Sequence, residues 1–509
     1  MSILNPTFAQ RADSFKRELK HTKVFPKNIV EFLKDDRCFQ GLGVKKIAEH
    51  KLPIILNSGD SVILNFGDHC VGYLNFSVNH VIGKTITDSP VQLKFTFGEF
   101  PYEITTPPES YKGSLGSGWL QNETKSIVFT PYNSVLERRY SFKYVKIERL
   151  DKACFPIQIT DMFVDCVSAV DMADVKPVNI PDKKLEQIYN MSLKTLKECE
   201  QDVFEDGPKR DRRLWMGDLR LQALTDYYTF RNLDLIIRCI YLFAAYLTDK
   251  RCVASCLFPD SYPYVDEWNF SDYSLYFVSC LLDYTVNTGD KSVGEELYDI
   301  AEEQVKIFAD WFNSVDEDKS ISHSFFIDWC ENLDKDVAYI GVYLYVLKQL
   351  STLANLLNKK CDFVVQEIQK ASKRLFAYYS AQEEFFMPNS KQISWHSQVW
   401  AVLSGELSNE DAIKLLKKTA SVNPEYIMHT PYMMHFYVEA LFNCGLKDEA
   451  MNYIRETWGK MVDYGYDCCP ELFNTINHFE SPYGAPELNS ACHAWSCTPA
   501  YWIHKYYFV

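Results

Sequence analysis

The chain changes character at residues 181–196, which read Pro-Asp-Lys-Lys-Leu-Glu-Gln-Ile-Tyr-Asn-Met-Ser-Leu-Lys-Thr-Leu. Apolar side chains recur in this stretch at the three- and four-residue intervals of an amphipathic helix, at Leu185, Ile188, Tyr189, Leu193 and Leu196. The Pro-Asp pair that opens it is typical of a helix start. We therefore expect a helical region to begin here and an earlier region of different structure to end just before it.

The region after this boundary predicts a run of helices. Asn287-Thr288-Gly289-Asp290 and Asn443-Cys444-Gly445 are two of the helix stops within it. Twelve segments have a helical pattern, and pairing neighbours gives six hairpins; a ring of six hairpins would form an α/α barrel with loops around one open end. An open solenoid is the alternative, but no fixed-period repeat supports it. The predicted helices lie near 183–202, 217–230, 232–249, 272–288, 292–315, 335–358, 361–380, 395–406, 409–420, 431–444, 446–459 and 489–506.

The region before the boundary predicts β-strands. Residues 91–98 read Val-Gln-Leu-Lys-Phe-Thr-Phe-Gly, with apolar residues at alternate positions. Residues 61–68, 73–78 and 140–147 show similar strand-like patterns, separated by Gly, Pro, Asn and Asp. Such strands at short spacing are typical of an antiparallel β-sandwich. The predicted architecture is a β-sandwich domain with an N-terminal extension over residues 1–178, followed by a six-hairpin (α/α) barrel over residues 179–509.

Composition narrows the classes of partner and compartment. With 509 residues, 53 Lys+Arg and 68 Asp+Glu, the net charge is −15. The acidic balance argues against a nucleic-acid backbone or an anionic membrane as the main partner, since both require clustered cations. No secretory signal pattern precedes residue 20, and the 16 Cys are scattered, so we expect a cytoplasmic protein with reduced thiols. Cys468, Cys469, Cys492 and Cys497 contain no Cys-x-x-Cys pair, so we predict no metal site and no cofactor.

The most unusual segment lies between the first two predicted helices. Residues 205–218 read Glu-Asp-Gly-Pro-Lys-Arg-Asp-Arg-Arg-Leu-Trp-Met-Gly-Asp and combine four acids, four cations and Trp215. A charged run is ordinarily a solvated loop, but the Gly-Pro and Gly-Asp pairs around Trp215 favour a shaped one. Carboxylates beside guanidinium groups stay ionised and can bind sugar hydroxyls.

Other candidates sit in loops that could reach the same open end of the barrel. Glu471 follows Pro470 in a short loop after the helix that ends near Trp458-Gly459. A single Glu in such a loop is ordinarily a solvent-exposed residue without a functional role. His493 and Trp495 stand at the start of the last predicted helix, where a His is more often a hydrogen-bonding residue than a catalyst. Two aromatic–acid groups precede predicted helices and could also lie there, Asp266-Glu267-Trp268 and Ile327-Asp328-Trp329.

Together these segments resemble glycoside hydrolase family 78, the six-hairpin α-L-rhamnosidases, over most of the chain. Residues 206–218 are similar to the family's signature Asp-Cys-Pro-x-Arg-Asp-Glu-Arg-x-x-Trp-x-Gly-Asp, and residues 458–471 to its Trp-Gly-x-Met…Trp-Glu motif. Residues 490–495 are similar to its Ser-x-Asn-His segment. The resemblance implies an inverting glycosidase that releases terminal α-L-rhamnose or a similar deoxy-sugar from small glycosides.

The resemblance also implies roles for individual residues. Glu471 falls at the position of the general base, and Trp268 and Trp329 would face the apolar side of the sugar. Arg212 stands where the family signature has its usual acidic residue, so Asp211, Asp218 and Glu267 become the candidates for the general acid. Asp211 adjoins that position, but its cationic neighbours would keep it ionised, which makes Glu267 a competitor. The residues expected to hold the sugar or line its site are Asp206, Arg210, Trp215, Trp268, Asp328, Trp329, His493 and Trp495.

Other classes of function stay open at this point. A glycoside phosphorylase or a polysaccharide lyase uses the same architecture, and the cations of residues 209–213 could supply a phosphate pocket. A decayed hydrolase that binds carbohydrate without cleaving it is a third hypothesis. The aromatic-rich composition is compatible with a homodimer.

Overall fold

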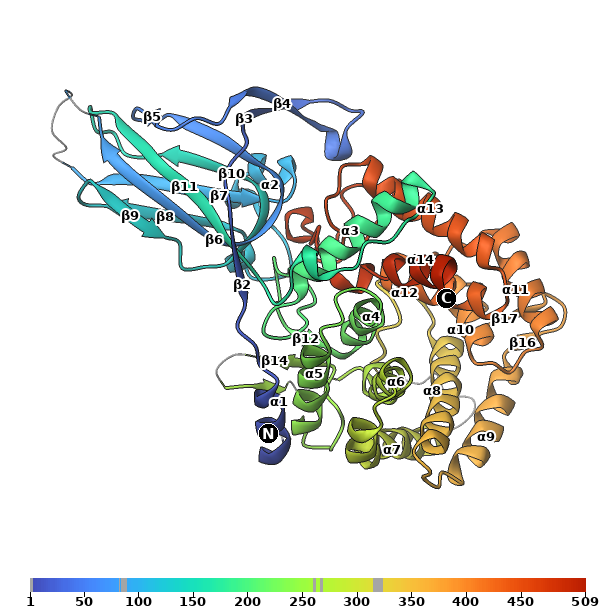
Figure 1. The fold of residues 1–509 in the computed structure, drawn as a ribbon. Helices are drawn as coiled ribbons and strands as arrows, with labels where there is room; N and C mark the ends of the chain where they lie inside the picture. Colours follow the sequence, from blue (N-terminus) through green and yellow to red (C-terminus); the bar gives the residue numbers. More distant parts are fainter. Residues whose placement is uncertain (1–2, 82, 84–88, 260–261, 266–268, 315–323) are drawn as a thin grey trace.

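The computed structural model describes residues 3–509 except 82, 84–88, 260–261, 266–268 and 315–323. An N-terminal antiparallel sheet domain packs beside a larger helical domain (Figure 1). The catalytic candidates come from loops of the helical domain, and the sheet domain approaches those loops from one side.

Within the described residues, the sheet domain has ten strands joined by antiparallel pairing. Its longest strand, β6, pairs with β10 between Ser61 and Gly72 and with β11 between Gly72 and His80. A glycine is needed at residue 72, where a Cβ atom would lie 2.2 Å from the backbone oxygen of Asp165. The main strand order is β2 (Lys20–Val24), β11 (Ile157–Ser168), β6 (Ser61–His80), β10 (Tyr140–Arg149), β7 (Val91–Gly98) and β8 (Asn122–Ile127), with β3 (Asn28–Lys34), β4 (Leu42–Glu49), β5 (Ile54–Leu56) and β9 (Tyr132–Val135) attached at the sides.

The alternating pattern of residues 91–98 is confirmed as a strand with one inward face. Val91, Leu93, Phe95 and Phe97 are buried in the core of the sheet domain, whereas Gln92 is exposed. Period-two alternation places these apolar side chains on one face of the strand, where their burial stabilises the domain.

The helical domain contains the predicted run of helices, and most boundaries agree within a few residues. The exception is the last helix, predicted over 489–506, which begins only at Pro499. In the preceding loop the amides of His493 and Ala494 donate to the backbone oxygens of Cys469 and Asp206, so they are not available to a helix. The helices are α3 (Lys183–Cys199), α4 (Met216–Asp226), α5 (Leu233–Ala245), α6 (Ser271–Thr288), α7 (Ser292–Ser314), α8 (Asp336–Leu356), α9 (Phe363–Ala377), α10 (Trp395–Leu403), α11 (Asn409–Val422), α12 (Pro431–Asn443), α13 (Lys447–Asp463) and α14 (Pro499–Phe508).

The helices pack in an alternating order. Helices α4, α6, α8, α10 and α12 contact one another in succession, and α3 contacts both α13 and α14. Helix α8 is long and apolar enough to cross a membrane by length and composition, but 72% of its apolar window is buried inside the protein. Its packing against α6, α9 and α10 accounts for that apolar composition.

The N-terminal extension expected within residues 1–178 packs on the helical domain and lies outside the sheet. Strand β1 (Ile3–Leu4) pairs with β13 (Tyr246–Leu247), and helix α1 (Pro6–Ser14) packs on α5 (Figure 1). The Arg238 guanidinium donates to the backbone oxygen of Ala12 at 3.0 Å and pairs with Asp13 at 3.1 Å. This segment therefore belongs structurally to the helical domain.

Candidate active site

The charged loop between α3 and α4 is a folded and largely buried structure. The amide of Asp206 donates to the Arg213 backbone oxygen at 3.0 Å, and the amide of Arg213 donates to Asp206 Oδ1 at 3.0 Å. Asp211 and Arg212 both adopt left-handed backbone conformations, with φ of 63° and 57°. Strained backbone of this kind is often found at functional sites, and here it turns the chain so that neighbouring side chains separate.

The four cations of this loop do not surround Asp211, so that part of the sequence interpretation is wrong. Lys209 contacts Glu103 at 2.7 Å and Glu99 at 3.4 Å, both in the sheet domain. The Arg213 guanidinium lies over the Phe258 ring, 4.2 Å from its centroid. Only Arg210 of the four forms an ion pair with Asp211, at 3.2 Å. The cations of residues 209–213 therefore do not converge on one phosphate pocket.

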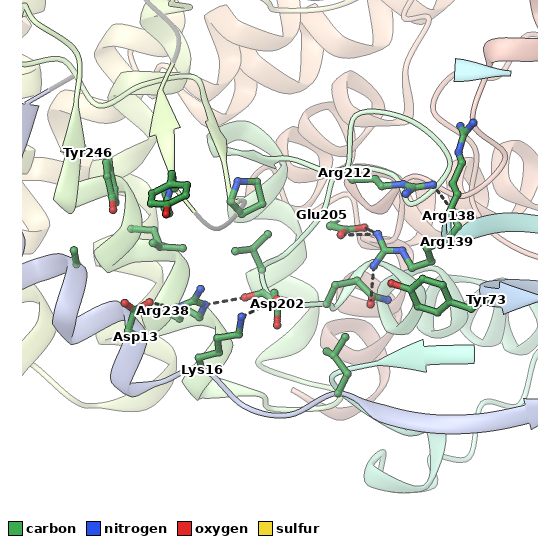
Figure 2. Close-up of a pocket in the computed structure, with 18 of the residues that line it drawn as sticks. Asp13, Lys16, Tyr73, Arg138, Arg139, Asp202, Glu205, Arg212, Arg238 and Tyr246 are labelled. Atoms are coloured by element: carbon green, nitrogen blue, oxygen red, sulfur yellow. Dashed lines mark hydrogen bonds and ion pairs between the residues drawn. The ribbon is translucent and has the colours of Figure 1, made fainter. Parts of the chain in front are cut away.

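Arg212 points away from the other candidates, into a different cavity (Figure 2). Its Nε donates to the Pro208 backbone oxygen at 2.8 Å, and its Nη2 donates to the backbone oxygen of Arg139. That cavity, of about 860 Å³, lies between the two domains and is lined by several other charged residues. Arg212 therefore does not take the place of an acid beside a bound sugar.

The loop that carries Glu471 is joined to the last loop of the chain by several hydrogen bonds. The Glu471 amide donates to the Ser490 backbone oxygen at 2.9 Å, and the Trp495 indole donates to the Glu471 backbone oxygen at 2.9 Å. The Ser496 hydroxyl donates to the Pro470 backbone oxygen at 2.6 Å. These bonds fix the backbone on both sides of the Glu471 carboxylate.

The Glu471 carboxylate faces the charged loop and is held there by Arg210. Arg210 Nη2 lies 2.9 Å from each Glu471 oxygen, and the Tyr483 hydroxyl donates to Oε1 of the same carboxylate. Burial alone would raise the pKa of Glu471, but the Arg210 charge and the Tyr483 hydrogen bond hold that pKa below its usual value. Glu471 is therefore ionised at neutral pH, as a general base must be.

Three further groups form a buried set beside this pair. Burial, together with repulsion from neighbouring carboxylates, raises the pKa of Asp206 and of Asp218 well above 3.8. His493 Nδ1 lies 3.5 Å from Asp218 Oδ1, and burial lowers the pKa of His493 to about 4. Burial therefore favours the uncharged forms of all three groups, and among the described residues Asp218 Oδ1 and His493 Nδ1 have no hydrogen-bond partner.

These groups line one cavity of about 280 Å³. The predicted residues that it brings together are Asp206, Arg210, Asp211, Trp215, Asp218, Trp329, Glu471, His493 and Trp495. The Arg210–Glu471 pair joins the charged loop to the Glu471 loop, 261 positions further along the chain, so these two loops reach the same cavity as expected. A cavity with apolar walls and a few convergent polar groups is the usual form of a small-molecule site.

Three predicted residues are not among these groups. Glu267 and Trp268 lie outside the described residues. Asp328 is buried away from the cavity, where its carboxylate pairs with His396 at 2.8 Å and accepts from the backbone amides of His429 and Thr430. Because its oxygens are occupied by protein donors, Asp328 has a structural role, and its assignment to sugar binding is corrected here.

Comparison with known families identifies the architecture around this cavity. Residues 26–166 match the glycosyl hydrolase family 78 α-rhamnosidase N-terminal domain, and residues 177–507 match the bacterial α-L-rhamnosidase six-hairpin glycosidase domain. The chain belongs to glycoside hydrolase family 78. It is a glycosidase of the α-L-rhamnosidase type, as the sequence predicted.

Solved structures agree with this family 78 membership. A rhamnosidase from Klebsiella oxytoca with rhamnose bound superposes with a TM-score of 0.93 at 35% identity, covering 99% of each chain. The family 78 rhamnosidase of Bacillus sp. GL1 superposes with a TM-score of 0.72 at 17% identity, covering 89% of this chain and 47% of the other. The second likeness supports the fold alone. No curated protein sequence matches the chain.

Several residues that line the cavity of this family 78 enzyme were missed in the sequence. Tyr483 contacts both Arg210 and Glu471, but its Ser-Pro-Tyr-Gly context is that of an ordinary turn. Trp119 of the sheet domain also lines the cavity, and its position in the glycine-rich stretch 116–119 was a usable signal. Tyr273 and Phe326 sit among ordinary apolar residues, so no pattern distinguished them from core.

Proposed function

We propose that this enzyme hydrolyses terminal α-L-rhamnosides of small glycosides, with inversion at the anomeric carbon. The observation that carries the proposal is the Glu471 carboxylate, held by Arg210 and Tyr483 at the wall of a cavity whose other wall is the charged loop of residues 205–218. The 35% identical rhamnosidase with bound rhamnose supports rhamnose as the sugar.

Glu471 acts as the general base in this proposal. Water attacks the anomeric carbon and gives a proton to the Glu471 carboxylate, while the bond to the leaving oxygen breaks. The Arg210 charge keeps the carboxylate ionised between turnovers. An inverting enzyme requires an acid and a base on opposite sides of the bond, with room for that water.

Asp211 acts as the general acid. Its side chain is 18% exposed and lines the cavity, whereas those of Asp206 and Asp218 are only 6% and 2% exposed and are held deep in the wall. Asp211 can therefore approach the glycosidic oxygen at the mouth of the site.

The remaining groups would hold the sugar. Neutral Asp206 and Asp218 can both donate and accept hydrogen bonds, which suits sugar hydroxyls. Trp215, Trp329 and Trp495 supply apolar and aromatic surface for the C–H face of a deoxy-sugar.

We also propose the finer architecture that this chemistry implies. The ten-stranded sheet would fold over its core as a β-sandwich, and the six helix pairs would close as an (α/α) barrel. The contact of α3 with α13 and α14 supports the closure, since it places the first hairpin against the last.

Replacing Glu471 with Gln tests the function directly. The variant removes the base while keeping the shape, so kcat on an aryl α-L-rhamnoside should fall by about 10²–10⁴-fold. Glu480→Gln is the matched control: that half-buried glutamate pairs with His429 at 2.6 Å, outside the catalytic cavity, and should stay active.

Two results would contradict the proposal. Unchanged turnover of Glu471→Gln, with a wild-type circular dichroism spectrum, would remove Glu471 from the mechanism. Turnover of the wild type that requires inorganic phosphate would show a phosphorylase instead. Proton NMR of the first rhamnose released reports whether the anomeric configuration inverts.

A further inference from the structure

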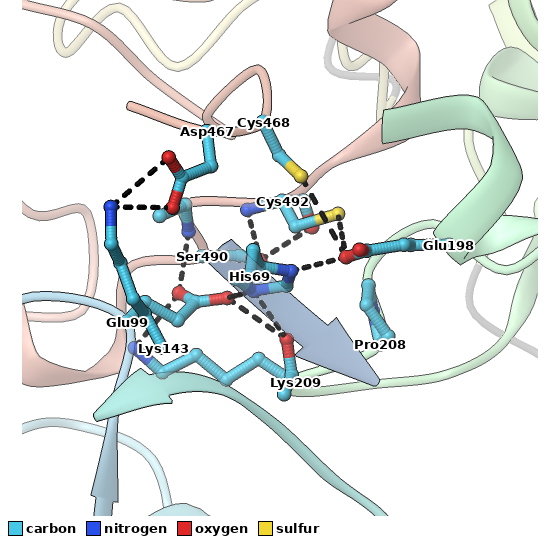
Figure 3. Close-up of polar contacts among 12 residues, drawn as sticks. His69, Glu99, Lys143, Glu198, Pro208, Lys209, Asp467, Cys468, Ser490 and Cys492 are labelled. Carbon is cyan, nitrogen blue, oxygen red and sulfur yellow. Dashed lines mark hydrogen bonds and ion pairs between the residues drawn. The ribbon is translucent and has the colours of Figure 1, made fainter. Parts of the chain in front are cut away.

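A second group of reactive side chains lies buried between the two domains (Figure 3). His69 comes from β6 and Glu198 from α3, while Cys468 and Cys492 come from the two loops that carry Glu471 and His493. Each offers one ligand atom, and the four atoms all lie within 4.8 Å of one another. All four residues are buried, and the hydrolytic mechanism uses none of them.

We propose that these four side chains bind one divalent transition-metal ion, with zinc the best match, in a tetrahedral structural site. Two thiolates, an imidazole and a carboxylate are a donor set that zinc accepts in proteins. Four protein ligands fill the coordination sphere, as in structural sites, and leave no open position for a substrate.

The distances agree with this geometry. Cys468 Sγ lies 3.7 Å and Cys492 Sγ lies 3.8 Å from Glu198 Oε2. With Zn–S near 2.3 Å and Zn–O near 2.0–2.2 Å, two ligands of a tetrahedron lie about 3.5–3.7 Å apart. His69 Nδ1 and the Glu198 carboxylate are in direct hydrogen-bond contact, closer than two ligands of one tetrahedron, so these two side chains would have to move apart to admit the ion.

The orientation of His69 is that of a supported metal ligand. Its Nδ1 faces Glu198 and the two thiols, while its Nε2 lies 2.9 Å from Glu99 Oε1. Glu99 is itself held by the Ser141 hydroxyl at 3.0 Å and by the Ala491 amide at 2.7 Å. A carboxylate that fixes the outer ring nitrogen of a ligating histidine is the common second partner in zinc sites.

The charges also balance. Binding would release the two thiol protons and the proton shared by His69 and Glu198, leaving a neutral imidazole, two thiolates and one carboxylate around a 2+ ion. The resulting charge of −1 would face Lys194, whose Nζ lies 3.9 Å from Glu198 Oε1 and also pairs with Asp68. Only two of the four cysteines considered in the sequence, Cys468 and Cys492, belong to this site. Cys469 contacts Ser192 and Cys497 contacts Thr225 instead.

The site would tie the catalytic loops to the rest of the protein. Cys492 directly precedes His493, and Cys468 lies three residues before Glu471. An ion shared with α3 and β6 would fix both loops against the helical and sheet domains at once. It would act on catalysis only by positioning them.

Metal content of the full-length protein tests the site without reference to catalysis. Protein purified without a metal-affinity tag should contain about one zinc per chain by mass spectrometry. After removal of the ion, addition of Co²⁺ should produce a thiolate-to-cobalt charge-transfer band. Cys468→Ser and Cys492→Ser should lose most of this band, whereas Cys469→Ser, a buried neighbour outside the cluster, should keep it.

Stability provides the second readout. Chelation should lower the melting temperature of the wild type and of Cys469→Ser, and added Zn²⁺ should restore it. The proposal is overturned if wild-type protein binds neither zinc nor cobalt stoichiometrically. It is also overturned if mass mapping finds a Cys468–Cys492 disulfide. Neither result depends on rhamnosidase activity.

Discussion

The Arg210 side chain contacts three polar groups of the catalytic cavity. It contacts Glu471 at 2.9 Å, Tyr483 at 2.7 Å and Asp211 at 3.2 Å, and its guanidinium lies 4.2 Å from the Tyr483 ring centroid. Arg210 Nη2 contacts both oxygens of Glu471, whereas Asp211 receives one longer contact from Nη1. The base and the proposed acid are therefore given different environments by the same residue.

The role of Asp211 predicts a dependence on the leaving group. Asp211→Asn removes the acid, so turnover of an alkyl rhamnoside should fall by about 10²–10⁴-fold. A dinitrophenyl rhamnoside, whose leaving group needs little protonation, should lose far less. The measurement is kcat/KM on both substrates. Asp218→Asn serves as the comparison and should affect both substrates alike; a leaving-group dependence in that variant instead would move the acid to Asp218.

The role of Arg210 predicts a shift in the pH profile. The Arg210 charge lowers the pKa of Glu471, so the base is ionised above that pKa and loses activity as the pH falls through it. Arg210→Gln removes the charge while burial remains, so the pKa of Glu471 should rise and the acidic limb of kcat/KM should move to higher pH. Tyr483→Phe removes one hydrogen bond but no charge and should move the limb less. An unshifted limb in Arg210→Gln would contradict this assignment.

A short element of the sheet domain completes the catalytic cavity. The turn η3 (Ser117–Trp119) carries Trp119 to the cavity, and Arg138, just before strand β10, holds this turn. Arg138 donates to the backbone oxygens of Gly118, Trp119 and Leu120 at 3.0–3.1 Å. The sheet domain is therefore part of the site, and the helical domain alone would leave the cavity open on this side.

Loosening this turn should weaken substrate binding more than chemistry. Arg138→Gln removes most of the three hydrogen bonds, so we expect kcat/KM to fall about tenfold, mainly through KM, which corresponds to ~1.4 kcal/mol. Arg37→Gln, at an arginine whose side chain is 89% exposed, is the control and should leave KM unchanged. A fall confined to kcat would argue against a binding role for the turn.

Most helices and strands could be predicted from local sequence patterns. The helices after residue 181 followed the three- and four-residue spacing of their apolar positions, because each presents one face to a core. The predicted start of the last helix was wrong because backbone amides within residues 489–498 bond to distant loops. A local sequence pattern contains no information on such distant partners.

On the scale of the whole molecule, the two domains are joined by buried charges. Lys209, at the centre of the charged loop, contacts Glu103 and Glu99 of the sheet domain and donates to the Asn489 backbone oxygen at 2.7 Å. Its side chain is 2% exposed. Removal of one charged partner from such a buried group leaves an uncompensated charge inside the protein.

Lys209→Met should therefore destabilise the interface between the domains. We expect the free energy of unfolding to fall by about 3–5 kcal/mol near neutral pH, which would lower the melting temperature. Burial raises the pKa of Glu103 to about 7, so below that pH the carboxyl gains a proton and the loss should shrink. Lys34→Met, at an exposed position of strand β3, is the control. An equal loss at pH 8 and pH 5.5 would contradict the assignment of the effect to Glu103.

The sequence by itself determined the two kinds of domain, the run of helices and the candidates Glu471, Arg210 and Asp211. Those features follow from periodicity and from short motifs, which act over a few residues. Only the tertiary structure decided that Lys209, Arg212 and Arg213 point away from Asp211, that Asp328 is structural and that Tyr483 meets Glu471. The physical reason is that side-chain direction and burial depend on contacts between residues far apart in the chain, and those same contacts set the charge of each carboxyl.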